Sequence, residues 1–358
     1  MNFISNRWNR IKHTPFFIKL LNWEYWPFGV IYAPAILYWF FLSIKTRSFF
    51  FFSAANPGIK TGGMLGESKI NILKKVPPVW LPKTVYHYKC SSWAETKEAL
   101  VSAQMSFPVI AKPDIGQRGF LVEKITSLQA LQSYLSQKEL DFIIQEFIDY
   151  PIELSIMYHR FPNQAHGSIT SATIKEFLSV TGDGHATIWQ LIQDKPRAKL
   201  QQKALAKMPA KILGSKPGKG KKVELVPFGN HCRGARFLNG NHMIDNKLVE
   251  VFDHLSQQLP GIYLGRFDLK CQSWDDLKAG KNFKILEING VGAEPAHIYD
   301  PSYTFWRAIK DIHKQWRIIY RLSIFNRKAG ESYMSFMDGM RQWAFLIRYK
   351  KLTRSYIQ

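Results

Sequence analysis

The stretches GRFDLK (265–270) and KILEING (284–290) place three polar side chains inside two apolar runs. Asp268 interrupts the first run, and Glu287 and Asn289 alternate with apolar residues in the second. Alternate residues of a strand face the same side of a sheet, so Glu287 and Asn289 are predicted to project together. Asp268 can face them from a neighbouring strand. Buried carboxylates repel each other unless protons or a cation lie between them, so this pattern indicates a site.

Two carboxylates and an amide oxygen form an all-oxygen ligand set, which suits Mg²⁺ that also binds nucleotide phosphates. Arg266 precedes Asp268 by two residues and shares its face, so it could hold a negative charge that develops during a reaction. The alternative interpretation is structural, with a buried ion pair between Arg266 and one of the two acids.

Two earlier segments add groups that suit a nucleotide. Lys112 ends a predicted strand just before a glycine-containing turn, where its ammonium can meet phosphates and the turn lets the backbone approach them. The later segment IIQEF (143–147) reads as a strand, and its edge could bind an adenine and a ribose. The residues predicted for that role are Gln145, Glu146, Phe147, Ile148 and Glu153.

The order of these segments resembles the ATP-grasp superfamily, and within it the carboxylate–amine ligases that include D-alanine–D-alanine ligase. The resemblance covers roughly residues 60–300, and the Arg-x-Asp and Glu-x-Asn pair is its most specific part. Further segments are similar to parts of that family that lie near the nucleotide: FPVIAKP (107–113), GESKINILKK (66–75), IIQEFIDYPIELSI (143–156) and SVTGDGHATIWQLI (179–192).

The resemblance implies an α/β fold of the α+β kind, in which two α/β subdomains clasp ATP. It assigns Asp268, Glu287 and Asn289 to two Mg²⁺ ions, with Mn²⁺ as a substitute, and Lys69 and Lys112 to the phosphates. A substrate carboxylate would take the γ-phosphoryl group to give an acyl phosphate, and an amine would then displace phosphate.

The acceptor side of the expected reaction is predicted from the loop VPFGNHCRGARF (226–237). Arg233 in this loop suits a two-point grip on a carboxylate or phosphate, and His231 and Arg236 lie beside it in sequence. A structural role is the alternative for His231. Together with Arg266 and Lys112, Arg233 is the predicted catalytic set.

Three more residues are candidates near the metal and the phosphates. Lys175, which precedes the GDG segment, is predicted to reach the phosphates. Glu294 and His297 follow the metal motif and could meet the amine or hold their loop in place. The sequence after Asn289 is GVGAEPAHIYDP rather than the Ser-Pro-Gly-type turn of D-alanine ligases, which argues against D-alanine as the substrate.

The composition points to anionic partners. The 358 residues carry a formal net charge of +22, and residues 195–222 hold ten Lys/Arg and no acid. No helix-turn-helix, RNA-recognition or zinc pattern is present, so nucleic acid is not the predicted partner. The three cysteines are widely spaced, which favours a reducing compartment.

The first 60 residues differ from the rest in composition. The uncharged stretch 25–44 is about as long as a minimal membrane-spanning helix, and two prolines interrupt it. We read residues 1–60 as an interfacial or re-entrant anchor; a buried aromatic hairpin and a dimer contact are the alternatives. Residues 61–300 are the predicted ATP-grasp domain. Residues 301–358 are a predicted basic helical tail that either meets a membrane surface or packs on the domain.

The sequence therefore predicts an ATP-dependent carboxylate–amine ligase at the cytoplasmic face of the inner membrane. Its substrates would be small-molecule or lipid carboxylates and amines, such as an envelope precursor, and it could form homo-oligomers. A cytoplasmic location follows instead if the N-terminal segment packs on the domain. The alternative function is a non-catalytic ATP-binding scaffold at the membrane.

Overall fold

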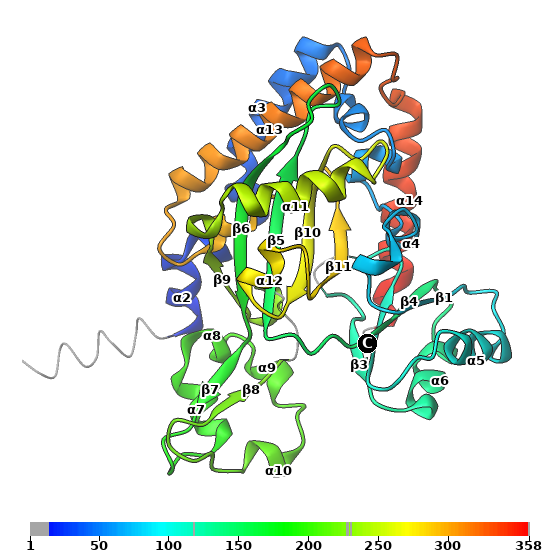
Figure 1. The fold of residues 1–358 in the computed structure, drawn as a ribbon. Coiled ribbons are helices and arrows are strands. Elements are labelled where there is room, and N and C mark those ends of the chain that lie inside the picture. Colours follow the sequence, from blue (N-terminus) through cyan, green and yellow to red (C-terminus); the bar gives the residue numbers. More distant parts are fainter. Residues whose placement is uncertain (1–13, 117–118, 227–228, 230, 357–358) are drawn as a thin grey trace, which may run out of the picture.

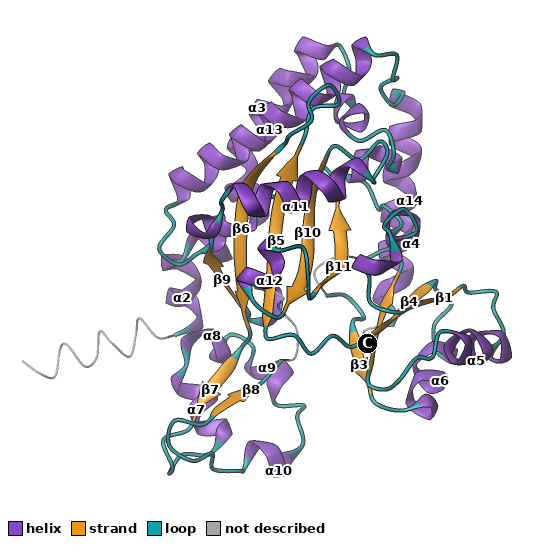
Figure 2. Cartoon of the chain, in the orientation of Figure 1, coloured by secondary structure: helices purple, strands orange, loops and turns teal. Residues whose placement is uncertain are grey.

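The computed structural model describes residues 14–116, 119–226, 229 and 231–356. It is a mixed α/β protein whose sheets are all antiparallel, so the predicted fold class is confirmed at this level (Figures 1 and 2).

The largest sheet has five strands in the order β11-β10-β5-β6-β9. Helices α11 (Asn246–Gln257) and α12 (Trp274–Lys278) cover one of its faces (Figure 1). The strands are β5 (Ile152–His159), β6 (Ser168–Glu176), β9 (Arg236–Asn239), β10 (Leu264–Cys271) and β11 (Phe283–Asn289).

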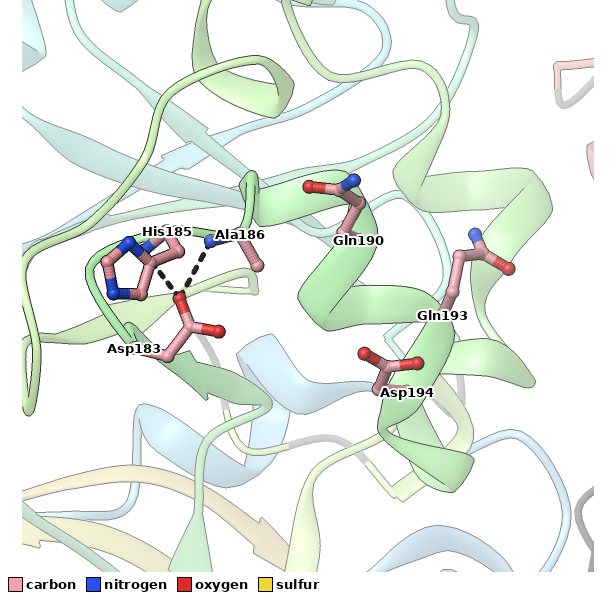
Figure 3. A pocket seen from close by; sticks show the side chains of 6 residues that line it. All are labelled: Asp183, His185, Ala186, Gln190, Gln193 and Asp194. Carbon is pink, nitrogen blue, oxygen red and sulfur yellow. Dashed lines mark hydrogen bonds between the residues drawn. The ribbon is translucent and has the colours of Figure 1, made fainter.

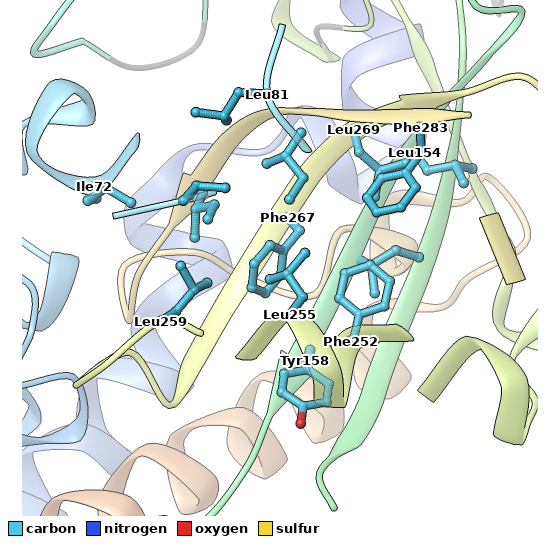
Figure 4. Packing of buried hydrophobic residues seen from close by; sticks show 14 of the residues in the cluster. Ile72, Leu81, Leu154, Tyr158, Phe252, Leu255, Leu259, Phe267, Leu269 and Phe283 are labelled. Atoms are coloured by element: carbon cyan, nitrogen blue, oxygen red, sulfur yellow. The ribbon is translucent and has the colours of Figure 1, made fainter. Parts of the chain in front are cut away.

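Alternation along β10 divides the core from the polar side of this sheet. Phe267 and Leu269 lie in the main hydrophobic cluster with Phe252 and Leu255 of α11 (Figure 4). Because successive side chains point to opposite faces, Asp268 projects away from this cluster. Burial of these large apolar side chains is the main source of stability for this part of the fold.

The second sheet has four strands in the order β1-β4-β2-β3 and carries α5 (Trp93–Ser102) and α6 (Leu128–Ser136). Its strands are β1 (Thr84–His87), β2 (Val109–Pro113), β3 (Glu123–Ile125) and β4 (Phe142–Glu146). The chain passes from β4 directly into β5, which connects the two sheets (Figure 1). The short helix α4 (Lys69–Leu73) and the 3₁₀ turns η3 (Lys60–Gly63) and η4 (Pro78–Trp80) precede β1.

A small lobe holds most of the basic stretch 195–222 (Figure 1). It contains a two-stranded sheet and four short helices around a small apolar cluster. Its elements are β7 (Ser179–Thr181), β8 (Lys222–Glu224), α7 (Ile188–Asp194), α8 (Pro196–Lys199), α9 (Gln202–Leu205) and α10 (Ala210–Leu213). The 3₁₀ turns η5 (His231–Arg233), η6 (Asn241–Met243) and η7 (Ala296–Tyr299) lie outside it.

The N-terminal segment forms α2 (Pro15–Leu21), η1 (Trp23–Tyr25), α3 (Phe28–Thr46) and η2 (Phe51–Ala55). Ile31, Ala35 and Leu42 of α3 are buried, and α3 lies along α13 (Phe305–Lys328). The opposite face of α3 is exposed, with Leu37 71% and Ile44 62% accessible. By length and composition α3 is also apolar enough to cross a membrane. The segment therefore packs on the protein with one stripe and leaves an apolar stripe outside. The chain ends in α14 (Phe336–Arg354).

Candidate active site

Strands β10 and β11 bring the predicted oxygen ligands together. Asp268 pairs directly across from Glu287, and Arg266 pairs across from Asn289. Asn289 follows Glu287 by two residues, so both share the face of Asp268. Asn289 Nδ2 also donates to Asp268 Oδ2 at 3.5 Å. The structure thus gathers these four side chains in one place, and their metal and catalytic roles stay predictions.

Asp268 is the most heavily engaged of these groups. It accepts hydrogen bonds from Ser155 Oγ at 2.6 Å and from Arg266 Nε at 3.1 Å, and Lys175 Nζ lies 3.5 Å away. Burial alone would raise the pKa of Asp268, but Arg266, Lys175 and Ser155 hold this pKa below its ordinary value. Asp268 is therefore an ionised carboxylate in an otherwise buried position.

Lys175 links Asp268 to the predicted ribose-binding acid. Its Nζ lies 3.3 Å from Glu153 Oε1, and both side chains are 7% exposed. Burial favours the neutral amine, yet Asp268 and Glu153 together raise the pKa of Lys175. Gly229 lies so close above this pair that a Cβ there would approach Glu153 Oε1 within 2.7 Å. Sequence reasoning predicted Lys175 and Glu153 separately and did not foresee that they pair.

Lys112 reaches the same face from the other sheet. The register of β10 and β11 shifts after Asp268, so Leu286 is an extra residue in β11. Lys112 Nζ donates to the carbonyl oxygen of Leu286 at 2.7 Å. Burial lowers the pKa of Lys112 to about 8, and the nearby Glu287 offsets part of this effect. The bulge therefore positions a buried lysine beside the two carboxylates.

Lys69 completes the cationic side. Its Nζ donates to the carbonyl oxygen of Gly116 at 2.6 Å and lies 3.5 Å from Glu287 Oε1. Ser68 caps α4, and its hydroxyl donates to Asp114 Oδ1 at 3.0 Å. The two lysines predicted to bind phosphates thus come from different parts of the chain and meet at Glu287.

Glu67 belongs to this site and was not predicted. Its Oε2 is buried without a hydrogen-bond partner among the described residues. Burial raises the pKa of Glu67, Lys69 and Arg266 oppose this, and the negative charge of Glu287 adds to it. The glycine-rich loop just before it, which the sequence shows, was the available signal.

The predicted adenine segment lies where β4 leads toward β5. The Glu146 N–H donates to the carbonyl oxygen of Lys83 at 2.9 Å, and the side chain of Gln145 donates to Thr84 Oγ1 at 3.3 Å. The carbonyl oxygen of Ile148 accepts from Lys270 Nζ at 2.9 Å. Several groups predicted to bind a base are therefore already bonded within the protein.

Lys270 is a second residue that sequence reasoning missed. It follows Asp268 on the same face of β10, it is 6% exposed, and its ammonium lies 5.1 Å from the ring centre of Phe147. Burial lowers the pKa of Lys270, and Glu153 opposes this. Its spacing from Asp268 was the signal that could have revealed it, because residues i and i+2 share a face.

The acceptor loop contacts the N-terminal segment. Glu24 of η1 accepts from Arg197 at 2.6 Å and lies 2.6 Å from His231 Nε2. Burial raises the pKa of Glu24, but the opposing effects of His231 and Arg197 are together larger, so this pKa lies below its ordinary value. Arg233 donates to the carbonyl oxygen of Gly119 at 2.8 Å. The alternative structural role of His231 therefore has a concrete partner in Glu24.

Glu294 lies between two tyrosines and near the predicted catalytic arginine. It accepts hydrogen bonds from Tyr32 of α3 and, at 2.8 Å, from Tyr299. Burial would lower the pKa of Arg266, but Asp268, Glu287 and also Glu294 raise it. The helix that the sequence marked as membrane-associated thus contributes Tyr32 to the edge of the site.

The two other acceptor candidates are placed differently. His297 is 2% exposed and lies 2.8 Å from Ser171 Oγ and 3.2 Å from Asp311 Oδ2, so it holds its loop in place. Arg236 forms a half-exposed ion pair with Glu176 at 3.6 Å.

A surface hollow lies apart from this site, in the small lobe (Figure 3). Asp183 of the GDG segment accepts there from the backbone N–H groups of Ala186 and His185, which lower the pKa of Asp183. Its lining residues are Asp183, His185, Ala186, Gln190, Gln193 and Asp194. Asp183 thus holds a local turn, and the hollow is separate from the lysine and carboxylate cluster.

The donor set can be compared with what a metal needs. Across the described ranges, no three His, Cys, Asp or Glu side chains form a metal-binding group. Asp268, Glu287 and Asn289 supply two carboxylates and an amide, which is the oxygen chemistry that Mg²⁺ takes when phosphates and water complete its shell. The residues present therefore fit a Mg²⁺–nucleotide site rather than an all-protein metal cage.

No protein-family model and no curated protein matches this sequence. Solved structures do resemble the fold. A bifunctional glutathione synthetase from Pasteurella multocida shares 14% identity at a TM-score of 0.37, over 74% of this chain and 38% of its own. The VanG D-Ala:D-Ser ligase from Enterococcus faecalis shares 13% sequence identity at a TM-score of 0.41, over 72% of this chain and 61% of its own. A D-alanine–D-alanine ligase from Bacillus anthracis shares 11% sequence identity at a TM-score of 0.40, over 74% of this chain and 69% of its own.

The matched region thus spans less than two thirds of the first two proteins. The ligase type named from the sequence motifs is also found among these structural neighbours. The TM-scores of these three structures lie below 0.5.

Proposed function

We propose that this chain is an ATP-dependent carboxylate–amine ligase of the ATP-grasp type. One observation supports this most strongly: Asp268 and Glu287 lie opposite each other on β10 and β11, and Lys69 and Lys112 approach them. A Mg²⁺–triphosphate needs such a combination of oxygen ligands and ammonium groups.

Asp268, Glu287 and Asn289 would hold two Mg²⁺ ions, with Mn²⁺ as a substitute. When bound, the ions neutralise phosphate charge and orient the terminal phosphate. Lys69 and Lys112 would replace their present contacts with backbone carbonyl oxygens by contacts with phosphate oxygens. Lys175 would join them through its position beside Asp268.

The base and the ribose would lie at the end of β4. The residues proposed to contact the base are at this end of β4 and just beyond it: Gln145, Glu146, Phe147 and Ile148. Glu153, proposed to contact the ribose, follows on β5. The ring of Phe147 has the ammonium of Lys124 at 3.5 Å and that of Lys270 at 5.1 Å from its centre, and a planar base could stack on this ring in place of one of them.

The reaction would proceed in two displacements. An oxygen of the substrate carboxylate attacks the γ-phosphorus, the bond to the bridging oxygen breaks, and ADP leaves. The amine nitrogen then attacks the acyl carbon, the C–O bond to phosphate breaks, and the nitrogen gives up one proton as inorganic phosphate leaves. Arg266, which Asp268 holds in place, would stabilise the negative charge on the acyl oxygen, and Arg233 would bind a carboxylate or phosphate.

The experiment is a screen of amino acids, acyl chains and lipids for release of ADP and phosphate from MgATP. A ligase releases both only when a carboxylate and an amine are supplied together. Equal release with and without these compounds, from protein that binds MgATP, would contradict the proposal.

We also place this activity at the cytoplasmic face of the inner membrane, on a lipid or envelope precursor. The exposed apolar stripe of α3 supports this location. Flotation with anionic vesicles tests it. Protein that stays entirely in the soluble fraction at physiological salt would remove the membrane from the proposal.

A non-catalytic ATP-binding scaffold is the second candidate. It is favoured by the internal bonds that already occupy the adenine segment. Binding of MgATP without turnover in the full substrate screen would support it.

A further inference from the structure

Helix α14 packs with small and polar residues inward and apolar residues outward. Its buried positions are Gly339, Gln342 and Thr353. Large apolar side chains on the same helix are exposed, among them Met337, Met340, Trp343 and Ile347. A helix that only closes a soluble core shows the opposite pattern, so the outward face indicates a partner.

Positive charge lies on this outward face among the apolar side chains. Met337, Met340 and Ile347 recur at helical spacing. Arg341 and Arg348 follow Met337 by four and eleven residues, so they share its side of the helix. Asp338 is the single acid of the helix. Against it stand five cationic side chains: Arg341, Arg348, Lys350, Lys351 and Arg354. Exposed apolar side chains with cationic ones among them are complementary to the surface of an anionic lipid bilayer.

Aromatic side chains connect α14 with α3. The ring of Phe336 lies 6.0 Å from that of Phe49, and the ring of Phe49 lies 4.5 Å from that of Trp39 in the second half of α3. Phe41 and Ile44 of α3 are exposed on another side of that helix. The two helices are therefore linked through these aromatic rings. A second copy of this chain would bring its own cationic side chains against those of α14, and like charges repel.

The inward face of α14 contacts two loops beside Lys69, one just before α4 and one just after β2. Gln342 Nε2 donates to the carbonyl oxygen of Leu65 at 3.3 Å, and Tyr349 Oη donates to that of Ile115 at 2.9 Å. Lys69 Nζ donates to Gly116, the residue after Ile115. The helix thus lies between the outer apolar surface and both loops that position this lysine.

We propose that α14 docks on an anionic bilayer and that docking tightens the binding of MgATP. Docking would hold α14 and, through Gln342 and Tyr349, the two loops around Lys69. The coupling rests on the proposed function, since it takes Lys69 as a phosphate-binding residue. The docking itself does not depend on it.

Docking is tested by flotation with vesicles of an equal mixture of phosphatidylglycerol and phosphatidylcholine, with pure phosphatidylcholine as comparison. The full chain is expected to float with the anionic vesicles only. Replacing Met340 and Ile347 by Glu should lower the partition coefficient at least about tenfold. The control variant carries Val79→Glu and Val101→Glu, both exposed apolar positions away from α14, and should behave as the wild type.

Equal flotation of the α14 variant and the wild type would overturn the docking. A second outcome would also overturn it. If the wild type is a dimer without vesicles and the Met340→Glu, Ile347→Glu variant is a monomer, the occupant of this face is a second copy of the chain.

Coupling is tested by the dissociation constant of MgATP with and without anionic vesicles. The coupling is supported if anionic vesicles lower this dissociation constant several-fold in the wild type and the control variant but not in the α14 variant. An unchanged dissociation constant in the wild type overturns the coupling. Complete absence of MgATP binding would defeat the proposed function while flotation still decides the docking.

Discussion

Asp268 on β10 and Glu287 on β11 are cross-strand partners, yet their surroundings differ. Asp268 is 11% exposed in its side chain and is shared by Arg266 and Lys175, whereas Glu287 is 27% exposed and pairs only with Lys69 among the described residues. The two carboxylates should therefore respond differently to removal of their charge. Asp268 supports the fold and the site, and Glu287 remains more available to a ligand.

Asp268→Asn is expected to destabilise the protein as well as inactivate it. The variant leaves the buried Lys175 and the partly exposed Arg266 without their shared carboxylate, and breaking a buried pair costs about 3–5 kcal/mol. Urea unfolding measures the loss. Glu250→Gln, at an exposed position of α11, is the control, and an Asp268→Asn protein as stable as this control would contradict the structure.

The stability of the wild type should depend on Asp268 in acid. The pKa of Asp268 is lowered in the folded state, so its contribution is complete above the ordinary value of 3.8 and is lost as the pH falls through the folded value. The free energy of unfolding, measured against pH, should therefore fall more steeply in this acid range for the wild type than for Asp268→Asn. Parallel curves would argue against an ionised, paired Asp268.

Lys112 should make nucleotide binding weaken in mild alkali. Burial lowers the pKa of Lys112 to about 8, so above this pH the free protein increasingly carries a neutral amine that attracts phosphate less. The dissociation constant of MgATP should rise between about pH 8 and pH 10. Lys112→Met should bind more weakly throughout and lack this rise. The same rise in the variant would assign it to another group.

Glu24→Gln should loosen the N-terminal segment. Glu24 is 8% exposed in its side chain and accepts from both Arg197 and His231, so the neutral amide loses two charge-assisted contacts. Trypsin should then cleave faster after Lys19, which is followed by mass spectrometry. The Glu250→Gln control should be cleaved at the wild-type rate. Unchanged cleavage in Glu24→Gln would mean that this contact does not hold the segment.

The polar pattern of residues 265–290 allowed the sequence to predict the arrangement of Asp268, Glu287 and Asn289. Strand alternation is local, so the shared face of these residues could be derived from spacing alone. The bulge at Leu286 could not be derived in this way, because no residue type near Leu286 demands a bulge. The pairing of Lys175 with Glu153 and Asp268 depends on the order β10-β5-β6, which is a long-range property.

The N-terminal segment shows the limit of composition. Its apolar content predicted an anchor, with a packed hairpin as the alternative, and the structure shows a helix that packs with one stripe and exposes the other. Its contacts with the site could not be predicted. Glu24 meets Arg197 and His231, and Tyr32 meets Glu294, across more than 170 residues of sequence.

The most direct test of the Mg²⁺–nucleotide site is calorimetric titration of MgATP into the wild type and into Glu287→Gln. The wild type should bind MgATP, and Glu287→Gln should keep its fold but bind at least about tenfold more weakly, a difference of about 1.4 kcal/mol. Glu250→Gln should bind as the wild type does. Failure of the wild type to bind MgATP, or equal affinity in Glu287→Gln, would contradict the site.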